Sequence, residues 1–61
     1  MTSEEFRQIR LRLGITQAEL ADLMGTYAQH ISRIERGDRA PTRLQAAFVR
    51  HIASTRGKGE R

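Results

Sequence analysis

Apolar residues recur at helical spacing in four separate stretches of this chain, and each stretch follows a threonine that has a glutamate or glutamine three residues later. Such T-x-x-E and T-x-x-Q pairs are typical of a capping box, in which the two side chains satisfy free backbone N–H groups at the start of a helix. The four threonines are Thr2, Thr16, Thr26 and Thr42. No stretch alternates apolar and polar residues with the period of a β-strand. We therefore predict a compact all-α fold of four helices, with five helices as the alternative.

Glycines mark the ends of the first three predicted helices, at Gly14, Gly25 and Gly37. Gly25 lies where the chain turns between the second helix and a third helix over residues 27–36, and a glycine there is free to take a positive φ angle. The last eight residues, STRGKGER, contain no apolar side chain. We expect one folded domain over residues 1–53 and a flexible polar tail over residues 54–61.

The length of 61 residues allows one domain, which buries only about 60% of the surface that its unfolded chain exposes. No cysteine is present, so neither disulfides nor thiolate metal sites can stabilise the fold. No apolar run approaches the ~18 residues of a membrane span, and the acidic start at Glu4 and Glu5 does not fit a signal peptide. We expect a soluble, cytoplasmic protein that relies on helix packing or on oligomerisation.

The net charge is +4, and ten of the eleven basic residues are arginine. The charge is uneven along the chain: residues 1–25 hold three basic and four acidic groups, whereas residues 26–61 hold eight basic and three acidic groups. A basic pole of this kind indicates a polyanionic partner, and the planar guanidinium suits phosphate and guanine. Solubility alone is the other explanation of the charge.

The second and third predicted helices carry the pattern of a helix-turn-helix. Ala21 is a small residue at the middle of the second helix, where a steeply crossing helix needs room, and Gly25 makes the turn. The angle between the helices would be filled by apolar side chains at Leu20, Met24, Ile31 and Ile34. An ordinary hairpin of two helices is the alternative, but the combination of these positions favours a helix that projects into a DNA groove.

The segment TQAELADLMGTYAQHISRIERGDRAP resembles the lambda repressor/Cro-like (XRE-type) helix-turn-helix family of prokaryotic and phage transcription regulators. The resemblance covers roughly residues 4–53. It implies that the helix from Gln17 crosses the DNA backbone, that the helix from about Tyr27 enters the major groove, and that a dimer reads two half-sites of double-stranded DNA. We expect a small phage- or mobile-element-type repressor that occupies an inverted-repeat operator as a homodimer.

The outer side of the third helix supplies the candidates for reading bases. With Ile31 and Ile34 inward at 100° per residue, Gln29 and Arg33 point almost directly away. An amide in this position can bind adenine and a guanidinium can bind guanine through two hydrogen bonds each. The predicted base-reading set is Tyr27, Ala28, Gln29, Ser32 and Arg33. A solvated helix face is the alternative for Gln29 and Arg33.

A second set of residues is predicted to hold phosphates without reading sequence. It combines the start of the second helix, where backbone N–H groups face outward, with the basic loop after the third helix. The predicted set is Thr16, Gln17, His30, Arg36, Arg39 and Arg43. For His30 a plain surface position is an equal alternative.

Two further expectations concern residues away from the DNA. By resemblance, Arg10 and Glu35 look like the family's structural ion pair between the first helix and the recognition helix. Because the polar tail leaves the fourth helix uncovered, we predict a dimer interface made of Phe48, Val49, His51 and Ile52. For His51 a partly buried histidine of the monomer is the alternative.

Other classes of function fit less well. The chain offers no activated nucleophile, paired carboxylates or phosphate-binding glycine loop, so we expect no catalytic residue, no cofactor and no small-molecule ligand. The two histidines fall in different helices without cysteines, so no metal site is expected. Two rivals stay open: an antitoxin-like subunit that binds a protein through the fourth helix, and a nucleic-acid binder without sequence preference.

Overall fold

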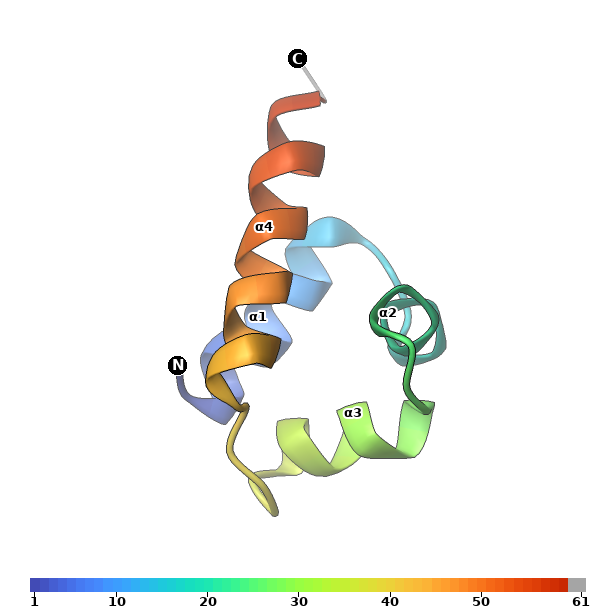
Figure 1. Cartoon of the computed structure of the whole chain (residues 1–61), viewed down its shortest axis with the longest axis vertical. Helices are drawn as coiled ribbons and strands as arrows, with labels where there is room; N and C mark the ends of the chain where they lie inside the picture. Colours follow the sequence, from blue (N-terminus) through green and yellow to red (C-terminus); the bar gives the residue numbers. More distant parts are fainter. Residues whose placement is uncertain (60–61) are drawn as a thin grey trace.

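The computed structural model describes the backbone of residues 1–59 and the side chains as far as Thr55. The chain forms helices α1 (Ser3–Leu13), α2 (Gln17–Met24), α3 (Ala28–Arg36) and α4 (Arg43–Gly59). Helix α4 runs along the molecule in front of α1, α2 is seen nearly end-on beside them, and α3 crosses the lower end (Figure 1). Helix α1 packs against both α3 and α4, and α2 packs against α3. The all-α prediction is confirmed.

Three of the four predicted capping boxes are present, at the starts of α1, α2 and α4. At α1, the hydroxyl of Thr2 accepts from the backbone N–H of Glu5 at 3.1 Å, and the Glu5 carboxylate accepts from the N–H of Thr2 at 2.8 Å. The boxes at Thr16 and Thr42 have the same reciprocal pattern. Each box supplies acceptors for N–H groups that have no partner at the start of a helix. This stabilises the helix by about 1 kcal/mol.

The fourth predicted box, at Thr26, does not form. The N-cap of α3 is Tyr27, which makes no hydrogen bond through its side chain, and the helix begins one residue later than predicted, at Ala28. The backbone N–H of Thr26 donates instead to the carbonyl of Ala21 at 2.8 Å and so closes the end of α2. Its hydroxyl lies 2.6 Å from Nδ1 of His30. Thr26 therefore ends one helix rather than starting the next.

The hydrophobic core joins all four helices. The five largest side chains without exposure to solvent are Phe6, Leu20, Ile31, Ile34 and Val49. Several half-buried apolar side chains, among them Met24 and Phe48, pack against this core. Since each helix contributes to one shared cluster, the position of α3 depends on all the others.

The position of Val49 and Ile52 corrects the predicted dimer interface. Both are buried in the core of the monomer, with 0% and 7% of their surface exposed. Next to them on α4, a stripe of Leu44, Ala47 and His51 is exposed, with Phe48 half-buried at its edge. The interface prediction is therefore wrong for Val49 and Ile52, because contact with α1 turns the helix so that the other apolar stripe faces the solvent.

The predicted boundary between the folded domain and the polar tail, at residue 53, falls within α4. Helix α4 continues through Ser54 and Thr55 to Gly59, so residues 54–59 are helical. The hydroxyl of Thr55 donates to the carbonyls of His51 and Ile52, one turn earlier in the helix, at 3.2 and 3.1 Å. Residues 60 and 61 of the predicted tail lie outside the described residues. Over residues 1–59, no helix is long and apolar enough to cross a membrane.

Candidate nucleic-acid interface

The turn between α2 and α3 sets the direction in which α3 leaves the body of the protein. Gly25 has φ +73°, in the left-handed region that favours glycine, and its N–H donates to the carbonyls of Ala21 and Asp22 at the end of α2. Ala21 is 2% exposed and lies within the core that α2 and α3 share. Its small side chain lets the two helices cross closely, as the helix-turn-helix pattern predicts.

Helix α3 has one buried side and one exposed side. Ile31 and Ile34 are fully buried and fix its rotation about its own axis. Gln29 and Arg33, on the opposite side, are exposed. Helix α3 crosses the lower end of the molecule (Figure 1), and its exposed side is open to solvent.

The structure places the five predicted base-reading residues on or beside this exposed side. Tyr27, Ala28, Gln29 and Arg33 are exposed, and Ser32 is half-buried. The Gln29 side chain makes no hydrogen bond within the part of the chain that the structure describes, since the expected contact with Thr26 does not form. Tyr27 is 72% exposed and its ring meets the ring of His30 edge-on, with the centroids 5.8 Å apart.

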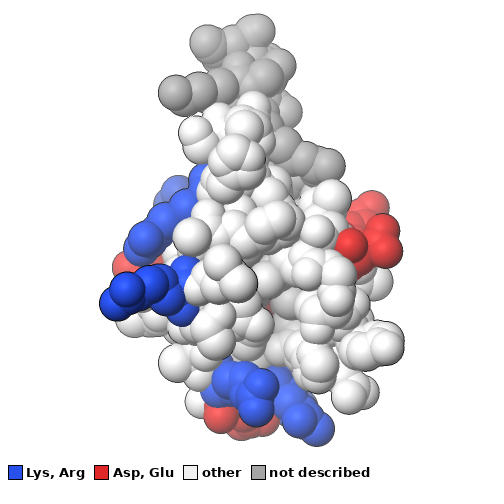
Figure 2. Space-filling model, in the orientation of Figure 1, with Lys and Arg blue, Asp and Glu red and all other residues white. Residues whose placement is uncertain are grey.

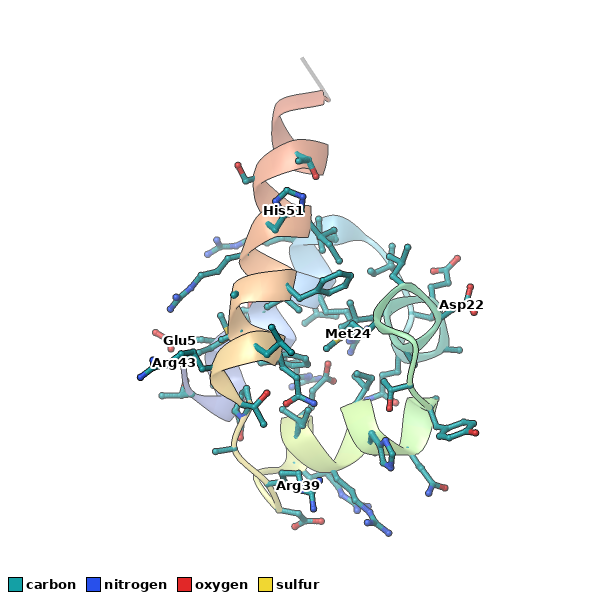
Figure 3. The ribbon with its side chains drawn as sticks, in the orientation of Figure 1. Glu5, Asp22, Met24, Arg39, Arg43 and His51 are labelled. Atoms are coloured by element: carbon teal, nitrogen blue, oxygen red, sulfur yellow. The ribbon has the colours of Figure 1, made fainter. Side chains whose placement is uncertain are left out.

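The end of α3 and the loop that follows it form a basic end of the molecule. Arginine side chains gather at the lower end in Figure 2, next to an acidic group, and Figure 3 shows that Arg39 points downward there. The guanidinium of Arg36 donates to the Asp38 carboxylate at 3.0 Å, and both side chains are more than half exposed. Arg43 points instead to the side of the molecule away from α2 (Figure 3). The predicted phosphate-binding arginines are therefore divided between two places.

At the start of α2, two predicted phosphate contacts are partly engaged within the protein. The Thr16 hydroxyl already accepts the N–H of Glu19 at 3.0 Å, which leaves its own O–H free to donate elsewhere. The side-chain amide of Gln17 donates to Glu35 at 3.0 Å. This contact joins residues 18 positions apart on different helices, so nothing local in the sequence indicates it. The backbone N–H groups of Gln17 and Ala18, in the first turn of α2, remain the part that suits a phosphate.

Glu35 receives hydrogen bonds from the two helices that flank α3. Arg10 on α1 donates through Nε at 2.6 Å and through Nη2 at 3.0 Å, and its Nη1 donates to the carbonyl of Ile15 at 2.9 Å. Gln17 on α2 adds the third bond to Glu35. Only 11% of the Arg10 side chain and 4% of the Glu35 side chain are exposed. The network therefore ties α1, α2 and α3 together beneath the exposed side of α3.

This network changes the ionisation of Glu35. Burial by itself raises the pKa of Glu35, but the hydrogen bonds from Arg10 and Gln17 and the charge of Arg10 outweigh it, so the pKa lies below its ordinary value of 4.5. The same hydrogen bond to Glu35 raises the pKa of Arg10. Both groups are therefore charged at neutral pH.

Helix α3 follows a tight turn, carries an amide and a guanidinium on its exposed side, and has arginines at its end. These features define the class of double-stranded DNA-binding domains with a helix-turn-helix. The chain matches the model of the helix-turn-helix family HTH_3 over residues 6–46. It belongs to this family, the XRE-type or lambda repressor/Cro-like DNA-binding transcription regulators. No significant match was found among curated proteins or among solved structures.

Nothing in the described part of the chain adds a metal centre to this surface. Among the described residues, no three His, Cys, Asp or Glu side chains gather closely enough to hold a metal ion. His30 is on α3, where Thr26 orients its ring, and His51 is exposed on α4. The two histidines therefore belong to different surfaces.

Proposed function

We propose that this protein represses transcription in a prokaryotic cell by occupying an operator, with α3 in the major groove of the DNA. The observation that carries the proposal is the orientation of α3: Ile31 and Ile34 anchor one side in the core while Gln29 and Arg33 extend into solvent on the other. A repressor of this kind blocks access of other proteins to the promoter by occupying the site. We further propose that it binds as a homodimer to an inverted repeat, with half-sites about one helical turn (~34 Å) apart.

The base-reading roles follow from the exposed side chains of α3. Gln29 has both an N–H₂ donor and a carbonyl acceptor available, which match N7 and N6 of adenine. Arg33, four residues later on the same side, matches O6 and N7 of guanine. Ala28 offers a methyl group for thymine, and Tyr27 and Ser32 flank these contacts at the two margins of the helix.

The phosphate contacts would come from both sides of α3. On one side are the backbone N–H groups at Gln17 and the free O–H of Thr16, and on the other are Arg36 and Arg39. His30 supplies its Nε2 as a further contact, because its Nδ1 is engaged with Thr26. Arg43 reaches phosphate only where the DNA extends along the side of α4. These contacts fix the register of α3 in the groove.

Selection of binding sites from random duplex DNA tests the proposal. The expected result is one recovered half-site, repeated in inverted orientation at a fixed spacing. A salt titration on the selected site and on a scrambled site follows: specific recognition predicts a preference of about 10³-fold or more, which persists as salt rises. Equal affinity for both sequences, with the same steep dependence on salt, would show a binder without sequence preference and overturn the proposal.

A further inference from the structure

We propose that the buried pair of Arg10 and Glu35 also serves DNA binding: it orients the side-chain amide of Gln17 so that the start of α2 holds one phosphate of the duplex. This inference rests on the proposed function, in which that end of α2 contacts the DNA backbone. It makes Arg10 and Glu35 positioning residues in addition to their role in the fold.

The start of α2 leaves two backbone N–H groups free for a ligand. The capping box occupies the N–H groups of Thr16 and Glu19, and the N–H of Leu20 donates to the carbonyl of Thr16 at 3.0 Å. The N–H groups of Gln17 and Ala18 have no partner in the described part of the chain, as is normal for the first turn of a helix. A phosphate at the start of α2 can accept both.

These N–H groups do not make a strong anion site by themselves. The carboxylate of Glu19 lies in the same turn, where it accepts the N–H of Thr16 at 2.8 Å. Its negative charge opposes the attraction that the start of a helix exerts on an anion. A phosphate at this position therefore needs a further well-directed donor, and Gln17 carries one on the first residue of the helix.

Glu35 determines which end of the Gln17 amide faces the protein. Nε2 of Gln17 donates to Oε1 of Glu35 at 3.0 Å. The reversed amide would place its carbonyl oxygen against the carboxylate, so that two acceptors would meet without a hydrogen between them. The amide nitrogen carries two hydrogens, and Glu35 uses one of them. The second can donate to the phosphate that also accepts the backbone N–H of Gln17.

Arg10 fixes both the carboxylate and the chain that enters α2. Its Nε and Nη2 donate to the two oxygens of Glu35 at 2.6 and 3.0 Å, which prevents the carboxylate from rotating. Its Nη1 donates to the carbonyl of Ile15 at 2.9 Å, two residues before Gln17. Since only 11% of the Arg10 side chain and 4% of the Glu35 side chain are exposed, water competes little for these bonds.

The pair supports a phosphate because its charges cancel. The carboxylate of Glu35 by itself would repel a second anion, but the guanidinium of Arg10 lies 2.6 Å away and neutralises it. In the opposite arrangement, the phosphate pulls the Gln17 amide away from Glu35. The pair would then compete with the DNA, and removing it would tighten binding. The two arrangements therefore differ in the sign of the effect.

Replacing both ions at once tests the positioning role without leaving a buried charge. Arg10→Met together with Glu35→Leu fills the site with apolar side chains of similar size, a change that commonly preserves the stability of a fold. Circular dichroism melting checks that the double variant is folded. The readout is a series of operator duplexes in which one phosphate at a time is replaced by a neutral methylphosphonate. In the parent chain, we expect the replacement opposite α2 to lower the affinity about tenfold, as for a hydrogen bond to a charged group.

In the double variant, the same replacement should lower the affinity about threefold or less, because the amide is no longer held toward the phosphate. Gln17→Ala should show the same reduced cost. The phosphate that Arg39 contacts is the control, and its replacement should cost the parent and the double variant the same factor. An undiminished cost opposite α2 in the double variant overturns the inference, and so does tighter binding of that variant to the unmodified operator.

A second measurement needs no variant of the pair. In nitrogen-15 NMR spectra of the parent chain, the side-chain amide signals of Gln17 should shift when duplex DNA is added. The Nε–H signal of Arg10 should stay protected from exchange with water, because the bond to Glu35 persists in the complex. Unchanged Gln17 signals overturn the inference, as does loss of the protected Arg10 signal on binding.

The outcomes separate this inference from the proposed function. A selected operator with an undiminished methylphosphonate cost in the double variant overturns the inference alone. Failure to select any sequence from random duplexes overturns the proposed function. A phosphate contact does not read bases, so the NMR titration with a scrambled duplex then still decides the role of Gln17 and of the pair.

Discussion

Arg10 and Glu35 are 25 positions apart in the sequence, yet the guanidinium of one holds the carboxylate of the other through two hydrogen bonds of 2.6 and 3.0 Å. The pair connects α1 to the helix that we propose to read DNA, and Gln17 adds a bond from α2. Ile31 and Ile34 anchor one side of α3 in the core. The polar network restricts the tilt of the helix in addition. The position of the reading side therefore depends on a buried polar contact as well as on the core.

Loss of one partner of the buried pair should be costly. In Glu35→Ala the guanidinium of Arg10 stays largely buried without its anion, and we expect a loss of about 3 kcal/mol in the free energy of unfolding, the lower end of the range for buried pairs. Asp38→Ala is the matched control, because it breaks the exposed pair with Arg36 and should lose less than about 0.5 kcal/mol. Urea denaturation monitored by circular dichroism gives both values. Equal losses for the two variants would contradict the structural role of the network.

The dependence of stability on pH should reveal the same pair. A carboxylate whose pKa is lower in the folded state than in the unfolded state stabilises the fold above its unfolded pKa and loses that effect as the pH falls. The pKa of Glu35 lies below 4.5 in the folded protein, so its contribution should be complete at neutral pH and should disappear as the pH falls below about 4.5. Unfolding of the parent and of Glu35→Gln across this range measures the difference.

Glu5 must be considered in that experiment, because its pKa is lowered as well, chiefly by the hydrogen bond from the backbone of Thr2. Both proteins retain Glu5, so its effect cancels in the comparison. A stability difference between the two proteins that stays constant from neutral to acid pH would show that Glu35 does not titrate with a lowered pKa.

Arg33 should determine the identity of one base pair. We expect Arg33→Ala to weaken binding to the selected operator by about 1–3 kcal/mol and to relax the preference at a single position. Gln29→Ala should do the same at a different position. Competition between the operator and single-base variants, measured by fluorescence anisotropy, identifies each position. If Arg33→Ala bound every variant as tightly as the parent does, the assignment of the reading side would be wrong.

Arg39 should act on all sequences alike. Its side chain points away from the body at the basic end, where a phosphate contact positions the protein without reading bases (Figure 3). We expect Arg39→Ala to weaken operator and scrambled DNA by the same factor, and to reduce the slope of log affinity against log salt by about 0.9. Arg7→Ala, an exposed arginine on α1, is the matched control and should leave the slope unchanged. A sequence-dependent loss would instead assign Arg39 to base reading.

The parts of the structure that could be predicted are those that depend on neighbours in the sequence. The boxes at Thr2, Thr16 and Thr42 span four residues each, and the turn at Gly25 follows from the conformational freedom of one residue. Thr26 has the same local pattern as the other three, but its N–H is needed by Ala21 at the end of the preceding helix. Two local signals compete there, and the sequence does not say which one prevails.

The rotation of α4 could not be predicted because its sequence has two adjacent apolar stripes. Ala46, Val49 and Ile52 form one, and Leu44 and Phe48 lie on the other. Either stripe could face the core, and only packing against α1 decides between them. The contact of Gln17 with Glu35 was missed for a related reason, since it depends on how three helices meet. In each case the missing information is tertiary.

Asp38 should limit the affinity for DNA. Its carboxylate pairs with Arg36 at 3.0 Å in the free protein, so a phosphate must displace it before Arg36 can bind the backbone, and the carboxylate then lies close to the polyanion. Because the pair is exposed, its strength is below about 1 kcal/mol, and Asp38→Asn should tighten binding up to about fivefold. The gain should be equal for operator and scrambled DNA and should shrink as salt rises, because salt screens exposed charges. Glu4→Gln removes a negative charge from α1 and controls for the change in net charge. An equal gain from both variants would mean that Asp38 acts only through the overall charge of the protein.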